Sequence, residues 1–154
     1  MAIKSNSTKN NKSSANSKSA SSSSSKSMAD SKIAVVDIQS LVNQTPSVQA
    51  LRQERQSQMA NLQQWINSAN SEINQLTDQA AKSALFQKYQ LELNQRQQML
   101  RQDYAQKVQT IDAELSKLIA DEAKAAGYDY VFAKGIVVFG GTDITEQVTK
   151  SLKK

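Results

Sequence analysis

Apolar side chains recur in steps of four and three residues through the middle of this 154-residue chain. Alternating steps of this kind keep one face of a helix turned toward a partner helix, as in the seam of a coiled coil. The series continues upstream with a cation, Arg55, in one seam position. Its central members are Leu62, Ile66, Ala69, Ile73, Leu76 and Ala80.

A second series follows and predicts a second long helix. From Leu100 to Ile111 its steps are 4, 4 and 3, an 11-residue repeat that unwinds a left-handed supercoil, so we expect nearly straight pairing there. Residues 77–83, between the two series, are polar but lack Gly and Pro. An antiparallel hairpin over residues 46–126 is therefore inferred from the two series rather than from a turn signal, and one continuous helix is the alternative. The second series comprises Phe86, Tyr89, Leu93, Leu100, Tyr104, Val108, Ile111, Leu115 and Leu118.

A hairpin with so narrow an apolar stripe cannot bury a large core within one chain. Hydrophobic residues make up only 38% of the sequence, so we expect several copies to associate. The chain has no Cys and no His, which excludes disulfides, thiol nucleophiles, the usual zinc ligands and the commonest general base. We therefore predict no catalysis, no cofactor and no metal site.

Residues 1–31 are mainly Ser, Asn and Lys and are predicted to be a disordered tail, because they cannot bury enough apolar surface to fold. They hold five lysines against Asp30, and thus four of the five net positive charges. The remainder is nearly neutral, so a specific nucleic-acid partner is not expected. The tail is interpreted as a linker or as a tether to an anionic surface. No signal peptide or membrane span is recognisable in the chain as given, which leaves a cytoplasmic location open.

Short strand-like segments flank the predicted hairpin. Residues 32–36 form a β-branched run typical of a strand, and Asp37 is a suitable N-cap for a brief helix over residues 38–43. Thr45 followed by Pro46 then indicates the start of the first long helix.

Gly127 is expected to end the second long helix. Residues 128–133 and 136–139 predict two more strands, and Lys134-Gly135 between them indicates a two-residue β-hairpin. Asp143 and Glu146 have the spacing of a helix start. The apolar face of this last helix would comprise Ile144, Val148 and Leu152.

The predicted fold class is α+β, with a long antiparallel coiled-coil hairpin projecting from a small β head. Three short strands leave edges and a sheet face that need cover, so the head, residues 32–45 with 127–154, is expected to assemble between chains. The candidate oligomerisation residues are Ile33, Val35, Val131, Val138, Ile144 and Val148.

This order of elements resembles the Skp family, also called OmpH-like proteins. The N-terminal match is Lys-Ile-Ala-Val-Val-Asp at 32–37, followed by Ser40-Leu41. The C-terminal match is Tyr-Asp-Tyr-Val at 128–131, Val-Val at 137–138 and Asp-Ile-Thr at 143–145, with Val148 and Leu152-Lys153. The resemblance covers residues 32–154 in architecture, and only the two ends in specific sequence.

The resemblance implies a jellyfish-shaped homotrimer, in which three hairpins extend as tentacles around a cavity. It also implies an ATP-independent periplasmic holdase that encloses unfolded outer-membrane β-barrel proteins. A coiled-coil scaffold or adaptor of the cell envelope is the alternative function, and a nucleic-acid binder acting through the tail is a third. Residues 46–126 contain equal numbers of basic and acidic side chains, so capture of clients by bulk positive charge is not expected.

Four residues are candidates for contact with an unfolded client. For the two aromatic residues, packing between the helices is the competing interpretation, and for the two lysines it is an ordinary solvated helix end. The lysines are also candidates for contact with anionic lipid. The four are Trp65, Lys82, Phe86 and Lys88.

Overall fold

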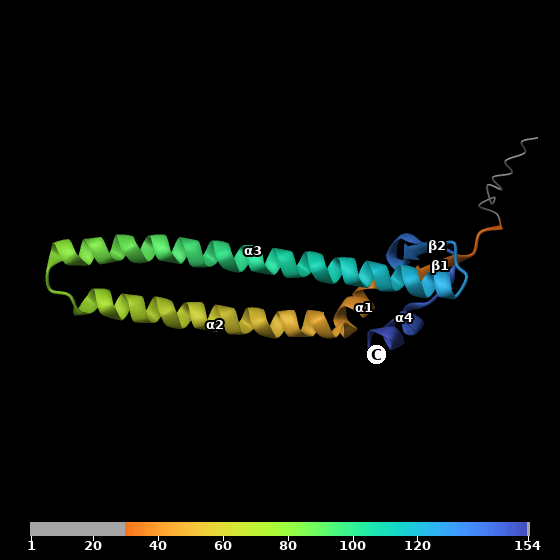
Figure 1. Ribbon diagram of the computed structural model, residues 1–154, viewed down its shortest axis with the longest axis horizontal. Helices are drawn as coiled ribbons and strands as arrows, with labels where there is room; N and C mark the ends of the chain where they lie inside the picture. Colours follow the sequence, from red (N-terminus) through yellow and green to blue (C-terminus); the bar gives the residue numbers. More distant parts are fainter. Residues whose placement is uncertain (1–29, 154) are drawn as a thin grey trace, which may run out of the picture.

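The computed structural model describes residues 30–153. The predicted disordered tail falls, apart from its last two residues, outside the described residues. Two long helices form an arm, and the remaining short elements gather at one end of it as a head (Figure 1). The short elements are β1 (Ile33–Val36), α1 (Ile38–Gln44), β2 (Tyr130–Ala133), the 3₁₀ turn η2 (Lys134–Ile136), β3 (Thr142–Asp143) and α4 (Thr145–Leu152).

The arm consists of α2 (Pro46–Gln75) and α3 (Gln79–Ala125), which run antiparallel and contact each other. The prediction of a helical hairpin is thus confirmed, and a single continuous helix is wrong. The chain reverses within residues 76–78, where Leu76 is extended and ends α2. Asp78 then caps α3, its carboxylate accepting hydrogen bonds from the backbone N–H groups of Ala80 (3.4 Å) and Ala81 (3.1 Å).

Packing along the arm is thin. Beyond the head, Ala69 is the one buried apolar side chain among the described arm residues, and the other seam residues are half-buried or exposed. Leu115 and Ala123, near the C-terminal end of α3, are also buried, but they belong to the core of the head. A single chain therefore stabilises the distal arm much less than the head.

The sheet of the head has the order β2-β1-β3, and both outer strands run parallel to β1. Parallel pairing of β1 with β2 is possible because the whole helical arm forms the crossover between them. Ile33 pairs with Tyr130 and Val35 with Phe132, so these four side chains share one face of the sheet.

The predicted two-residue β-hairpin at Lys134-Gly135 is wrong. Lys134 to Ile136 form a 3₁₀ turn, residues 137–141 form no strand, and the third strand is the two-residue β3. The physical reason lies in Gly140 and Gly141, whose φ angles of 88° and 86° turn the chain back across the sheet. A Cβ at position 141 would lie 2.8 Å from Val35 Cγ1, so only glycine permits this close crossing.

The core lies between the other face of the sheet and the helices α1, α3 and α4. Val36, Leu41 and Val148 are fully buried there, which contributes about 2 kcal/mol for each side chain. Asp37 caps α1 as predicted, accepting a hydrogen bond from Ser40 N at 3.1 Å. The predicted apolar face of α4 is confirmed for Ile144 and Val148, both buried. The helix itself begins at Thr145, so Asp143 lies one residue outside the cap position.

Candidate functional site

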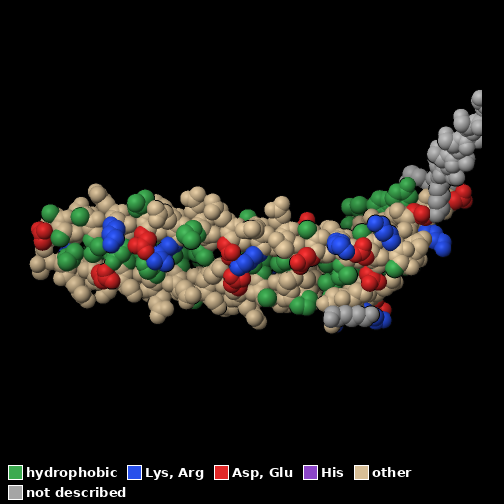
Figure 2. Space-filling view, in the orientation of Figure 1, with side chains coloured by type: hydrophobic (Ala, Val, Ile, Leu, Met, Phe, Trp, Pro, Cys, Tyr) green, Lys and Arg blue, Asp and Glu red, His purple; other side chains and the backbone are tan. Residues whose placement is uncertain are grey.

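Large hydrophobic side chains are exposed on the head beside β2, where Figure 2 shows hydrophobic atoms gathered on the surface. Ile136, Val138 and Phe139 are 72%, 102% and 97% exposed. The rings of Tyr130 and Phe132 stack next to them, with centroids 6.4 Å apart. We call this surface the head patch; it comprises Ile33, Tyr130, Phe132, Ile136, Val138 and Phe139.

An ion pair closes the loop that carries the exposed residues of the head patch. Lys134 Nζ lies 2.8 Å from Asp143 Oδ2, at the two ends of the loop. Lys134, then the hydroxyl and backbone N–H of Thr145, lower the pKa of Asp143 to about 2. The same pairing raises the pKa of Lys134. The loop therefore leaves the sheet from a fixed base while its apolar side chains stay in solvent.

The candidate oligomerisation residues divide into three groups. Val138 is fully exposed, and Ile33 lies half-buried on the open sheet face. Val35 shares that face but is covered by the loop at Gly141. The other three, Val131, Ile144 and Val148, pack into the core of their own chain.

Sequence reasoning missed four members of the head patch: Tyr130, Phe132, Ile136 and Phe139. The signal was present in the continuous apolar run over 136–139, which the sequence suggested as a paired strand. An unpaired segment with the same composition leaves its side chains in solvent.

The middle of the arm has a groove on each side of its seam. Leu62 and Leu100 line both grooves and form their shared floor. The larger, about 730 Å³, is lined by three carboxylates, and we call it the acidic groove. The smaller, about 340 Å³, is lined by two arginines and no carboxylate, and we call it the arginine groove.

Charges in the acidic groove neutralise one another. Lys107 of α3 binds Glu54 of α2 and, at 2.9 Å, Asp103 of its own helix. Gln58 donates to both carboxylates, at 3.1 and 3.2 Å. The hydrogen bond to Glu54, followed by that to Asp103, raises the pKa of Lys107, and Lys107 lowers the pKa of Asp103. Arg96 pairs with Glu92 at 2.6 Å in the same groove. Figure 2 accordingly shows basic and acidic side chains next to one another along the visible face of the arm.

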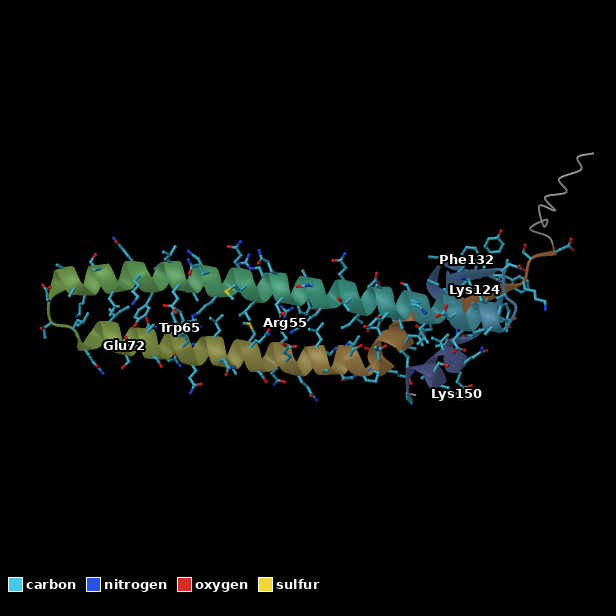
Figure 3. The ribbon with its side chains drawn as sticks, viewed as in Figure 1. Arg55, Trp65, Glu72, Lys124, Phe132 and Lys150 are labelled. Atoms are coloured by element: carbon cyan, nitrogen blue, oxygen red, sulfur yellow. The ribbon has the colours of Figure 1, made fainter. Side chains whose placement is uncertain are left out.

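Aromatic side chains connect α2 with α3 through cation–π contacts in both directions. The Arg55 guanidinium of α2 lies 4.4 Å from the ring centroid of Tyr104, and that of Arg96 in α3 lies 4.6 Å from the ring of Trp65. Figure 3 shows Arg55 and Trp65 between the two helices. The seam cation therefore stacks on an aromatic ring of the partner helix, which stabilises the register of the pair.

Trp65 also packs edge-on against Tyr89, with centroids 5.7 Å apart. The Tyr89 hydroxyl donates to Glu72, and this hydrogen bond is the main cause of the raised pKa of Tyr89. Trp65 is thus held between the helices, where it stabilises the hairpin.

The other candidate client-contact residues lie near the tip of the arm. Phe86 is 52% exposed, Lys82 is half-buried and Lys88 is exposed. Phe86 and Lys88 are two residues apart on a helix of 3.6 residues per turn, so they point in diverging directions. The structure therefore does not bring the four candidates together as one site.

Within residues 30–153, no helix has both the length and the apolar character that a membrane span requires. The same residues contain no cluster of three acidic, His or Cys side chains suited to hold a metal.

A family model described as "Outer membrane protein (OmpH-like)" matches residues 32–152. A search of curated proteins found no match.

Proposed function

The chain belongs to the OmpH-like family, and from this premise we propose that it is an ATP-independent holdase chaperone for unfolded outer-membrane β-barrel proteins. Membership in this family suggests an outer-membrane protein chaperone, and it implies the periplasm as the place of action. The proposal adds the mode of action: the arm shelters an unfolded client and prevents its aggregation.

The exposed head patch is the observation that supports this proposal most directly. Val138 and Phe139 are almost fully exposed, and the open sheet face offers a further groove of about 430 Å³ lined by apolar residues and the two glycines. Contiguous apolar surface of this kind marks an interaction site. We assign it to association of the head, residues 32–45 with 127–154, into a homotrimer.

In such an assembly the arms, residues 46–126, are free to surround a client. Exposed hydrophobic residues recur along α3, at Phe86, Leu91, Met99 and Val108, without gathering into one deep groove. Many weak apolar contacts suit a client that must be released later. Lys82 and Lys88 near the tip are proposed to meet anionic client segments or lipid head groups.

The test is the aggregation of an unfolded outer-membrane β-barrel protein on dilution from urea. We expect the chain, at one trimer per client, to suppress light scattering without ATP. A matched variant, Val138→Asp, should lose suppression together with oligomer mass. Unchanged aggregation with the unmodified chain refutes the proposal. Retention of one folded partner in a pull-down, instead of diverse unfolded ones, identifies a scaffold or adaptor of the envelope.

A further inference from the structure

The two grooves of the arm differ in charge although the arm as a whole is neutral. Every cation of the acidic groove is paired with a carboxylate. In the arginine groove, Arg55 and Arg101 face no carboxylate, and among residues 30–153 neither forms an ion pair. In the middle of the arm, positive charge that is not paired with a carboxylate therefore lies in the arginine groove.

The apolar surface of the arginine groove is accessible. Met59 is 55% exposed and Tyr104 is 37% exposed, and the floor is formed by Leu62 and Leu100. Arg55 is held over the Tyr104 ring at 4.4 Å, which fixes its guanidinium at the groove without neutralising it. The groove thus combines a positioned guanidinium, a second one without an ion pair among residues 30–153, and apolar side chains.

A guanidinium binds a carboxylate through two parallel N–H···O bonds, a geometry that the ammonium of lysine cannot reproduce. Apolar walls beside it favour an aromatic or aliphatic neighbour of that carboxylate. With a volume of about 340 Å³, the groove accommodates a few side chains of an extended segment rather than a folded domain.

We propose that the arginine groove, through Arg55, Arg101, Met59 and Tyr104, is a docking site for unfolded polypeptide segments in which acidic residues neighbour aromatic or aliphatic ones. This inference rests on the proposed holdase function and names the side of the arm that faces the client. Bidentate binding at Arg101 supplies selectivity, and the apolar floor supplies contact area.

Two methionines provide a matched pair for locating the client. Met59 lines the arginine groove and Met99 lines the acidic groove; both are exposed, at 55% and 68%, in the middle of the arm. A photo-crosslinking amino acid at position 59 should label an unfolded outer-membrane β-barrel protein at least about fivefold more than the same group at position 99. Equal labelling, or stronger labelling from position 99, overturns the proposal. Labelling of a second copy of the chain from position 59 overturns it as well, because the groove is then an interface between arms.

The charge requirement is tested with two short peptides that alternate Tyr with Glu or Tyr with Gln and carry a neutral fluorophore. The Glu peptide should bind more tightly, and added salt should weaken only its binding. Arg55→Gln/Arg101→Gln should weaken it about five- to tenfold, since exposed ion pairs contribute modestly. Arg101→Lys should recover only part of the loss.

Lys124→Gln/Lys150→Gln removes the same total charge outside the groove and serves as the control. An equal loss in this control overturns the proposal, because it shows that net charge alone governs binding. Arg101→Gln alone separates binding from the stability of the hairpin, because Arg101 forms no hydrogen bond or ion pair within residues 30–153. If the unmodified chain fails to bind any unfolded client, the holdase function itself is refuted. If the unmodified chain binds and the arginine variants bind equally well, only the assignment of the groove is refuted.

Discussion

Gly141→Ala should destabilise the head more than any other glycine-to-alanine change in the described chain. The backbone there has φ 86°, which costs an L-residue about 1 kcal/mol or more. The added Cβ would also lie 2.8 Å from Val35 Cγ1. Relieving such an overlap in a packed site costs about 1–3 kcal/mol, so the total loss should be about 2–4 kcal/mol.

Gly140→Ala is the matched control. Its φ of 88° is nearly the same, but a Cβ at that position meets nothing within 4 Å. The backbone cost is therefore shared by the two variants, and the difference between them isolates the contact with Val35. Urea denaturation at one fixed protein concentration measures this difference, since oligomerisation makes apparent stability concentration-dependent.

A second comparison identifies the atom responsible for the loss. Val35→Ala removes Cγ1 and should relieve part of the cost of Gly141→Ala, giving a coupling free energy of about 1–2 kcal/mol in a double-mutant cycle. Hydrogen exchange at the amide of Val35 should report the same local opening. Equal losses for the two glycine variants, or additive effects in the cycle, would refute the close crossing as the reason for glycine at position 141.

Three further predictions concern the head patch, the arm tip and the loop base. Val138→Asp should leave the stability of a single chain within about 0.5 kcal/mol, because the side chain is 102% exposed, but it should lower the sedimentation mass; an unchanged mass contradicts its place in the interface. Asp78→Ala should cost about 1 kcal/mol and speed hydrogen exchange at residues 80–82, whereas Gln79→Ala should not; equal exchange in both variants argues against the cap. Because the folded pKa of Asp143 is lowered from 3.8 to about 2, its pairing stabilises the head above pH 3.8, and this contribution is lost as pH falls through about 2. The difference in unfolding free energy between the unmodified chain and Asp143→Asn should shrink over that range, and a constant difference excludes the ion pair as its cause.

The long helices could be predicted because their seam residues repeat over many turns. The reversal between them had a local signal that was not used: Asp78 is an N-cap residue directly before a helix-forming run. The third strand could not be placed in this way. Residues 136–139 are β-branched and aromatic like a strand, and only the positive φ angles of Gly140 and Gly141 show that the chain crosses the sheet instead of pairing.

The two grooves could not be predicted from the sequence either, because they depend on which residues of α2 and α3 lie opposite one another. Glu54 and Lys107 are separated by 53 residues, and nothing local in the sequence indicates that they meet. The sequence could place Arg55 as a cation in the seam. Its aromatic partner, Tyr104, required the observed register.

More side chains are buried in the head of this chain than in its arm, and the difference bears on how a client could bind. The head holds the three largest fully buried side chains, Leu41, Val36 and Val148, whereas the middle of the arm has half-buried seam residues joined by exposed ion pairs and cation–π contacts. Each such contact contributes about 1 kcal/mol or less at an exposed site. They help to set which side chains line each groove, and the grooves share no lining residue with the core of the head. A segment can therefore enter the arginine groove without unfolding the base on which the assembly depends.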